Sequence, residues 1–460
     1  MTAATTIHNS LGRALFDMTW PMIFGVLALM SYQLVDSIFI SRLGVGPLAA
    51  LGFTVPANQL VIGIQVGVGV ATTALLSRAL GAGDEARARR LGGLVVVAGG
   101  LVLLLVCLVL WLLRSALPLA LGADPRLLPQ IHGYWLPWLA SAWVGAMLYF
   151  GYSVCRANGD TRLPGLMMVL TSLANLVLDP LFIFTFGWGL PGAALATLAA
   201  FGGGAVVVYW RLFQRRWLDF DLAALPPRTA LRQLAAISGP AMFGQLMPGL
   251  AAMLATALIA EFGAAAVAGW ALATRLEFFS IVVVLALTMS LPPMVGRLLG
   301  AGELAKIGQL VRLAVRFVLG LQLAVALGWL LVSGPLPGLL TPEPAVAGVL
   351  RNYLLLVPLS YGALGVCMLM VSVCNALGLP LRALLISCLR LFACYLPALW
   401  LGAQLAGLEG AFAGALAGNL AAGTVSWLLY RRALAQLQPA DKAGPPPPSL
   451  RGGGSRRSNA

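Results

Sequence analysis

Apolar runs of about twenty residues or more recur along the whole chain, and short polar stretches separate them. Leu91–Leu113 and Val311–Val332 are two of these runs. A membrane-spanning helix needs roughly 20 apolar residues, whereas the strands of a membrane barrel are about 10 residues long and alternate in polarity. The pattern therefore predicts an all-α integral membrane protein. Twelve transmembrane helices are expected, at residues 15–40, 47–79, 91–113, 129–155, 163–186, 190–212, 233–260, 266–298, 310–333, 350–375, 381–405 and 410–430.

The sequence also repeats itself at an offset of 219 residues. Pro21 aligns with Pro240, and the run Leu-Gly-Ala-Gly at 80–83 aligns with the same run at 299–302. Because each half carries six spans, both halves share one orientation, and we expect two homologous six-helix lobes related by a pseudo-twofold axis along the membrane normal. Two lobes with a seam between them can rock around a central site, which favours transport; a duplicated scaffold without transport is the alternative.

The repeat and the local composition predict the domain boundaries. The first lobe covers residues 1–212, a charged cytoplasmic linker covers 213–232, and the second lobe covers 233–433. Residues 434–460 are rich in Pro, Gly and Ser, as in the run Pro445–Pro448. Such a composition cannot bury enough apolar surface to order the chain, so it predicts a disordered tail.

Composition supports the membrane assignment and gives the orientation. Hydrophobic residues make up 60% of the chain and charged residues 10%, whereas a soluble protein carries about 25% charged residues. The net charge of +14 does not indicate nucleic-acid binding, because arginine and lysine gather in the loops of one side, as in the cytoplasmic loops of membrane proteins. Both termini are therefore predicted to lie in the cytoplasm. The side chains expected inside are Arg87, Arg89, Arg90, Arg162, Arg215, Arg216, Arg228, Lys306, Arg312, Arg431 and Arg432, against Arg42, Arg114, Arg126 and Arg351 outside.

Neither the termini nor the cysteines indicate further chemistry. The first span lacks a small-residue cleavage site, so we interpret it as a retained helix and not as a signal peptide. No Cys-x-x-Cys pair occurs, and His8 and His132 form no cluster, so we expect free buried thiols, no metal site and no cofactor. The cysteines are Cys107, Cys155, Cys367, Cys374, Cys388 and Cys394.

Acidic side chains inside the predicted spans are the main candidates for function. Counting helix rise from the outer ends of their spans places Asp36 roughly 9 Å and Asp179 roughly 12 Å deep. The same count puts Tyr134 and Thr197 at similar depths, and Asn175 lies one turn from Asp179 on the same face. A carboxylate in lipid is costly and usually pairs, faces a cavity or binds an ion. We therefore expect one polar layer in the outer half of the first lobe.

Three interpretations of this layer stay open. Two carboxylates in a poorly hydrated cavity cannot easily both ionise, so the pair could carry a proton. The same oxygens, with those of Asn175 and Thr197, could instead coordinate Na⁺, and simple hydrogen bonding between helices is the third interpretation. The repeat partner of Asp36 is Ala255, and Asp179 maps to Pro397 or Ala398. This asymmetry suggests ion coupling in the first half and a substrate surface in the second.

The second half offers weaker candidates. Glu277 lies near the middle of the eighth span, where it could attract a cationic substrate or be neutralised by a neighbouring helix. Flexible methionines and broad aromatic faces suit the binding of flat cations, although ordinary helix packing explains them equally well. The candidate substrate-binding residues are Glu277, Gln245, Met242, Trp270 and Tyr361. Pro21 could be a hinge within the first span, but Pro240 argues equally for a structural kink shared by both halves.

Several segments together resemble the MATE family of multidrug and toxin extrusion transporters. They are Pro21 through Asp36 to Leu43-Gly44, the run 48–52 (LAALG), the run 80–84 (LGAGD), the run 159–164 (GDTRLP), the run 175–180 (NLVLDP) and the run 192–197 (GAALAT). The resemblance covers nearly the whole chain. It implies twelve helices in two lobes and antiport of organic cations and drugs against H⁺ or Na⁺.

The resemblance also implies roles for particular residues. Asp36, Asn175, Asp179 and Thr197 match the first-lobe cation site of bacterial and archaeal members, and Tyr134 matches a tyrosine near it. The seventh and tenth spans lack the acids that other branches place there. We expect a monomeric, multi-pass transporter in the cytoplasmic (inner) membrane of a bacterium, in contact with lipid and small molecules and not with nucleic acid.

Other functions find less support in the sequence. A flippase for a lipid-linked precursor is the main alternative, but it would need a cationic central cavity, and only Arg275 and Arg390 lie deep among the basic residues. A membrane prenyl transferase would need paired acidic motifs, and ATP-driven transport would need a Gly-x-x-x-x-Gly-Lys-[Ser/Thr] loop. Neither motif occurs in the sequence, so an enzyme is not expected.

Overall fold

A computed structural model of the chain describes residues 3–221 and 227–437, and its described residues are helical with short connections. Eleven of the described helical segments are long and apolar enough to cross a membrane. The last of these, Pro380–Leu437, contains a break at Ala406 and Gly407 and therefore accounts for two spans. The predicted all-α fold with twelve spans in two lobes is confirmed.

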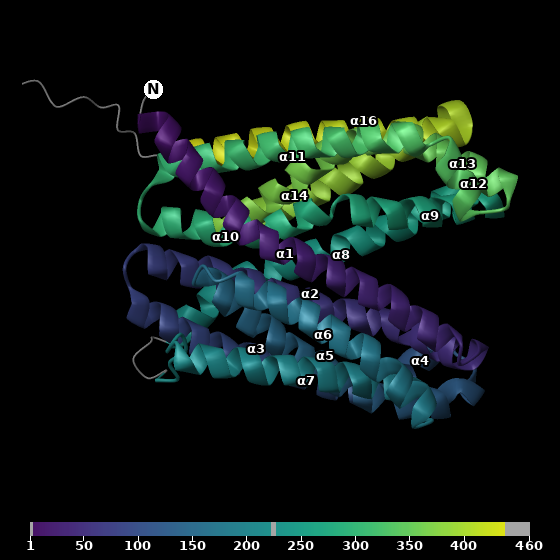
Figure 1. Ribbon diagram of the computed structural model, residues 1–460, viewed down its shortest axis with the longest axis horizontal. Helices are drawn as coiled ribbons and strands as arrows, with labels where there is room; N and C mark the ends of the chain where they lie inside the picture. The colour runs from purple at the N-terminus through teal and green to yellow at the C-terminus, as the bar shows by residue number, and fades with distance from the viewer. Residues whose placement is uncertain (1–2, 222–226, 438–460) are drawn as a thin grey trace, which may run out of the picture.

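The first lobe contains the helices drawn from purple to teal in Figure 1. Its main helices follow one another antiparallel, and a 3₁₀ turn and a π-helical turn interrupt the series. The elements are α1 (Ala3–Ser41), α2 (Val45–Gly81), α3 (Glu85–Leu112), α4 (Ala116–Ala120), η1 (Pro125–Leu127), α5 (Leu128–Ala157), α6 (Arg162–Pro180), the π-turn η2 (Leu181–Thr185) and α7 (Gly189–Gln214).

The second lobe contains the helices drawn from green to yellow in Figure 1. It repeats the order of the first lobe with three differences. The eighth span is divided at Ile281 into two helices, the tenth span is divided by the 3₁₀ turn η4, and the π-helical turn lies earlier in its span. The elements are α8 (Pro227–Ala260), α9 (Ala264–Ser280), α10 (Val282–Gly300), α11 (Leu304–Val332), α12 (Pro335–Leu340), α13 (Pro344–Leu356), η4 (Val357–Ser360), α14 (Tyr361–Ala376), α15 (Pro380–Cys388), the π-turn η5 (Leu389–Tyr395) and α16 (Leu396–Leu437).

Helix lengths differ from the expected boundaries at the linker and at the tail. Helix α8 begins at Pro227, six residues before the expected start at 233, so part of the charged linker is helical. Helix α16 runs on to Leu437, beyond the expected end of the lobe at 433. The rest of the tail, residues 438–460, lies outside the described residues.

The lobes meet along α1, α2, α8 and α10. Helix α1 starts against α10 and α11 of the second lobe and then packs on α6 of the first, so it crosses the seam (Figure 1). Helices α2 and α10 approach closely where the repeated Leu-Gly-Ala-Gly runs end them. A Cβ atom on Gly81 would lie 2.1 Å from the carbonyl oxygen of Arg297, and one on Gly300 would lie 2.1 Å from that of Arg78. Only glycine permits this contact, which explains why both halves carry the run.

Two arginines form reciprocal clamps across the seam. Arg78 at the end of α2 donates from Nε (3.1 Å) and Nη2 (2.7 Å) to the carbonyl of Ala376, the last residue of α14. Arg297 at the end of α10 donates in the same way, at 3.2 and 3.0 Å, to the carbonyl of Ala157, the last residue of α5. Each cation thus meets an unsatisfied carbonyl at the negative end of a helix. The 219-residue repeat relates one clamp to the other.

The clamps join the lobes at one end only. Arg78 and Arg297 lie next to the loops that the arginine bias predicts to be cytoplasmic. Thr19 of α1 also reaches across the seam, to Ser290 of α10 at 2.7 Å. Among residues 3–221 and 227–437, these are the side-chain hydrogen bonds that link the first lobe to the second.

We predict that Gly81→Ala destabilises the folded protein by about 1–3 kcal/mol, the usual cost of overpacking, because the added methyl group collides with the backbone of α10. The matched control is Gly52→Ala in the same helix, where a Cβ meets nothing within 4 Å. The control should be neutral or slightly stabilising, because alanine is the better helix former. Thermal unfolding of the purified variants in detergent measures the stability of each. Equal unfolding midpoints for the two variants would contradict the close contact.

Candidate ion-coupling site

Close packing of α1 on α6 brings the two predicted carboxylates together. Gly165 near the start of α6 lies against α1, where an added Cβ would be 2.4 Å from the carbonyl oxygen of Pro21. From this contact the two helices run side by side toward the opposite end of the lobe, where α1 carries Asp36 and α6 carries Asp179. Pro21 lies inside α1, and its carbonyl forms part of this contact.

The two carboxyl groups lie within hydrogen-bonding reach of each other. Asp179 is 1% exposed and Asp36 is half-buried. Each has a buried Oδ1 atom with no hydrogen-bond partner among the described residues. Two like charges so close in a low-dielectric interior cannot both persist, so the pair requires a shared proton or a cation between the oxygens.

Asn175 lies one turn before Asp179 and is fully buried. Its amide can pair with the hydrogen-bond donors and acceptors around it in only one of its two orientations. With Nδ2 toward the carboxyl group it donates to Asp179 Oδ2 at 2.7 Å, and its Oδ1 accepts from Thr197 Oγ1 at 3.0 Å. The opposite orientation would set the amide oxygen against the carboxylate and the amide N–H groups against donors. The amide therefore links Asp179 to α7 by hydrogen bonds alone.

The π-turn η2 and a glycine place Thr197 beside this amide. Pro180 lacks an N–H group, and the chain after it widens into the π-turn before α7 begins. Gly192 lies against the turn, where an added Cβ would be 2.7 Å from the carbonyl oxygen of Phe182. Helix α7 can therefore approach α6 closely, and Thr197 follows Gly192 by little more than one turn.

Two tyrosines complete the polar layer. Tyr134 of α5, which the sequence indicated, is 6% exposed and lies within range of the charge on Asp36. Tyr32 of α1 lies within range of both carboxylates, and the sequence analysis missed it. The sequence does indicate this residue, because Tyr32 precedes Asp36 by four residues and so lies on the same helix face. The structure thus gathers all five predicted coupling residues, and Tyr32, in one part of the first lobe.

Glu277 of α9 has a partner on a neighbouring helix. The hydroxyl of Tyr353 in α13 donates to Glu277 Oε2. Arg390 of η5 lies within range of the same carboxylate, and Tyr361 and Tyr395 lie near it. The tyrosine and Arg390 therefore offer the neutralisation by neighbouring helices that was one of the two interpretations of Glu277. No sequence spacing indicated Tyr353, because α13 is remote from α9 along the chain.

The structure divides the predicted substrate-binding residues between two places, with Tyr361 near Glu277 in the second lobe and with Met242 and Gln245 on α8. Trp270 and Tyr361 are buried in the core of the second lobe, and the Trp270 ring stacks on Phe412 at 6.2 Å. Met242 lies at the seam, packed against Gly67 of α2, and Gln245 is exposed one turn further along α8. Met242 and Gln245 can face a substrate between the lobes, whereas Trp270 and Tyr361 contribute to the hydrophobic core.

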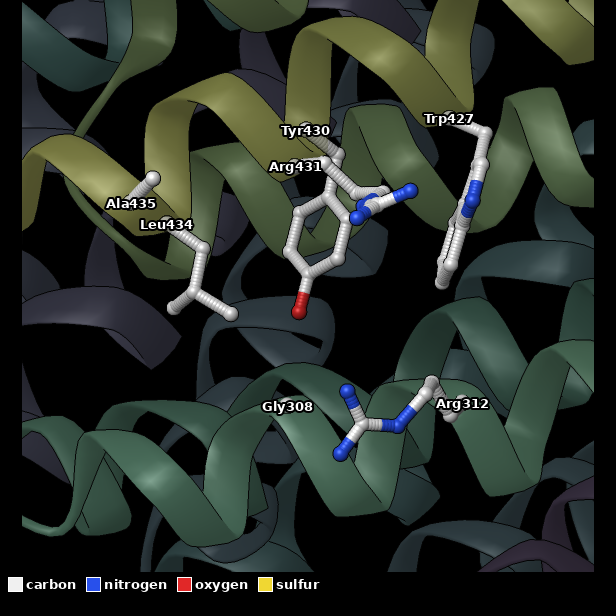
Figure 2. Close-up of a pocket in the computed structure, with 7 residues that line it drawn as sticks. All are labelled: Gly308, Arg312, Trp427, Tyr430, Arg431, Leu434 and Ala435. Atoms are coloured by element: carbon white, nitrogen blue, oxygen red, sulfur yellow. The ribbon is translucent and has the colours of Figure 1, made fainter.

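Three cavities lie elsewhere among the described residues, and one of about 430 Å³ borders Arg78 and Gly300 at the clamped end of the seam. One of about 50 Å³ lies at the seam near the arginine clamps and is bordered by Arg156, a residue that the sequence analysis did not select. Another, of about 350 Å³, lies between α11 and α16 (Figure 2). Its lining residues are Gly308, Arg312, Trp427, Tyr430, Arg431, Leu434 and Ala435, which belong to the second lobe alone.

Comparison with known families agrees with this architecture. The MatE family model matches the chain twice, at residues 21–181 and 240–401. The two matches begin 219 residues apart, which is the offset of the sequence repeat. The two matches together cover more than half of the chain. The chain therefore belongs to the MatE family of multi-pass membrane transporters and is not an enzyme.

Relatives and solved structures extend the match to nearly the whole chain. The Vibrio cholerae MATE transporter VcmN in the bent form is 57% identical, with a TM-score of 0.92 over 94% of this chain and 99% of that chain. The FAD transporter of Shewanella oneidensis is 32% identical over 92% of this chain and 95% of its own length. The multidrug export protein MepA of Staphylococcus aureus is 24% identical over 62% of this chain and 63% of its own length.

We predict strong coupling between Asn175 and Asp179 in a double-mutant cycle of folding stability. Asn175→Leu should cost about 1–3 kcal/mol, because it leaves a buried carboxyl oxygen without its donor. Asp179→Leu should lower the folding stability by a similar amount, because it leaves the buried amide of Asn175 without its acceptor. The double variant should cost less than the sum, since an apolar pair leaves no unsatisfied group. Additive losses in thermal unfolding would show that the amide does not serve the carboxyl group.

Proposed function

We propose that this transporter exports small organic compounds in exchange for protons, and that Asp36 and Asp179 carry the coupling proton. The observation that supports this proposal most directly is the proximity of two carboxyl groups from different helices, the buried Asp179 and the half-buried Asp36. The second lobe has Ala255 at the position equivalent to Asp36 and keeps the same scaffold, so packing does not require the acids.

Proton exchange follows from the electrostatics of the pair. One proton between two carboxyl groups removes the repulsion and supplies a hydrogen bond, whereas loss of that proton leaves two charges in a poorly hydrated place. Relief then requires water, a cation or a separation of the carboxylates. Because Asp36 and Asp179 belong to α1 and α6, a change in protonation alters the attraction between two helices, and α1 also contacts the second lobe.

A sodium ion is the alternative coupling ion, and the amide of Asn175 argues against it. Coordination would turn Asn175 Oδ1 toward an ion shared with the carboxylates. Assigned from its hydrogen-bonding neighbours, the amide instead turns Nδ2 toward Asp179, and its oxygen accepts from Thr197. The amide oxygen that would coordinate Na⁺ is therefore already engaged in a hydrogen bond, so we favour the proton as the coupling ion.

The arginine clamps supply a latch for alternating access. The four hydrogen bonds from Arg78 and Arg297 hold the lobes together at the predicted cytoplasmic end. Opening that end must break bonds from charged donors, each worth about 1.5–3 kcal/mol, which water then partly replaces. The closed latch thus corresponds to a state whose site faces outward, and its release corresponds to the state that loads substrate from the cytoplasm.

Substrate class is the finer part of the proposal. We propose organic cations and other drugs as substrates, in line with the name of the multidrug export protein MepA. A second candidate is an anionic nucleotide-like compound, since the relative from Shewanella oneidensis is named a FAD transporter. A buried arginine at the seam, Arg156, favours this second candidate.

We predict that Asp36→Asn abolishes proton-driven export while leaving the fold intact. In proteoliposomes without Na⁺, wild type should export ethidium under an imposed pH gradient, and the variant should fall to the rate of protein-free vesicles. The matched control is Asp17→Asn, the same change at an exposed position of the same helix, which should retain transport.

The same vesicles distinguish the coupling ions. A Na⁺ gradient at equal pH should drive no ethidium export in wild type. Export driven by Na⁺ and lost in Asp36→Asn would replace the proton by sodium at the same site. Proton-driven export that survives in Asp36→Asn would refute the coupling role of the pair.

We predict that Arg78→Gln with Arg297→Gln opens the clamped end of the seam. Spin labels at Ala82→Cys and Ala301→Cys, two positions related by the repeat, should report a longer and broader distance distribution in the double variant. The control is Arg316→Gln with Arg432→Gln, which removes the same charge from two exposed positions. An unchanged distribution would mean that the glycine contact alone holds this end closed.

A further inference from the structure

The cavity at the seam lies on the pseudo-twofold axis of the molecule. Its lining contains pairs of residues separated by the repeat offset of 219, one from each lobe: Gly69 with Thr288, Val70 with Met289, Thr73 with Pro292, and Arg156 with Asn375. The cavity measures about 50 Å³, enough for several water molecules or one small polar group. A cavity on this axis is shared equally by both lobes and opens when they separate.

One charge breaks the symmetry of this cavity. Arg156 in the last turn of α5 is 3% exposed, whereas its repeat partner is the neutral Asn375. The guanidinium lies 5.0 Å from the ring centre of Tyr149, and its Nη2 donates to Ser153 at 2.8 Å. Among the described residues, Arg156 has no ion pair, and its Nε and Nη1 atoms have no hydrogen-bond partner.

Packing does not account for this arginine. A basic residue does stabilise the end of a helix, but an exposed side chain achieves that without the cost of burial. Asn375 occupies the same place in the last turn of the equivalent helix of the second lobe without a charge. A buried cation with two unused donors is costly unless an anion meets it in another state of the protein.

We propose that Arg156 binds the anionic group, a phosphate or carboxylate, of an organic substrate at this cavity. The proposal deepens the proposed function and rests on it, since it assumes transport through the seam. The unpartnered Nη1 of Arg156 offers donors to the oxygens of one anionic group, and Asn375 and Ser372 add polar atoms from the second lobe. The clamp at Ala157 and Ala376 lies beside the cavity, so its release exposes Arg156 to the cytoplasm, where an anionic substrate loads.

The position of this site separates it from the coupling pair. Asp36 lies five residues from the end of α1 at Ser41, on the predicted outer side, and Arg156 lies one residue from the end of α5 at Ala157, on the predicted cytoplasmic side. A substrate with an anionic group therefore meets the positive end of the seam first. The carboxylates stay free to exchange their proton.

Riboflavin and flavin mononucleotide test the proposal, because they differ by one phosphate group. Binding to the purified protein is measured by flavin fluorescence. Wild type should bind the mononucleotide at least about tenfold more tightly than riboflavin, the discrimination that hydrogen bonds to a charged group supply. Arg156→Gln should abolish this difference and leave riboflavin binding unchanged, and Arg156→Lys should retain part of it. The control is Arg162→Gln, an exposed arginine one loop away, which should bind as wild type does.

Each outcome decides between the two proposals. Equal binding of both flavins by wild type, or discrimination that survives in Arg156→Gln, overturns the anion site. Displacement of the mononucleotide by an equal concentration of inorganic phosphate would overturn the assignment to an organic substrate and leave a site for free anions. Ethidium export under a pH gradient, measured in wild type, is the separate test of proton coupling. Its absence in wild type would refute proton-coupled export while leaving the flavin comparison valid.

Discussion

Repulsion between two carboxyl groups in a poorly hydrated interior is the constraint on which the proposed mechanism depends. Asp36 and Asp179 approach within hydrogen-bonding reach, so a proton or a cation must accompany them. Three features of the first lobe bring them there: the glycine contact of α1 with α6, the π-turn after Pro180, and the approach of α7 through Gly192. Water in place of this packing would solvate both charges and remove the need for a partner.

The duplication provides a scaffold, and function arises where the two copies differ. The clamps of Arg78 and Arg297 are the same in both halves, and so are the contacts of Gly81 and Gly300 with the backbone of the opposite helix, because each stabilises the seam from one side. The carboxylates and Arg156 occur in the first half only. A residue kept in both copies therefore indicates a structural role here, whereas a charge in one copy indicates a task that the fold does not need.

Charges of opposite sign occupy opposite ends of the same lobe. The acidic pair lies toward the predicted outer side, and Arg156 lies toward the predicted cytoplasmic side, next to the clamps. Such a separation keeps the arginine from neutralising the carboxylates, so the pair can respond to protons. In the proposed mechanism the ion and the substrate therefore do not compete for one place, and movement of the lobes about their seam connects the two sites.

The sequence by itself determined the helices, the repeat and the first-lobe polar layer. Apolar runs of membrane length and an offset of 219 residues are local or linear properties, and helix rise places Asp36, Asn175 and Asp179 at one depth without any knowledge of packing. Tyr32 could have been found in the same way from its spacing to Asp36.

Only the tertiary structure decided which charges have partners. Glu277 meets Tyr353 because α9 and α13 pack together, and no periodicity relates these positions. Trp270 and Tyr361 look like a binding surface in sequence, but helix packing places them in the core. Arg156 looks like an ordinary end-of-helix arginine, and its burial on the axis depends on how two lobes meet. Contacts between distant segments depend on shape and distance in three dimensions, and the order of residues along a chain does not contain these.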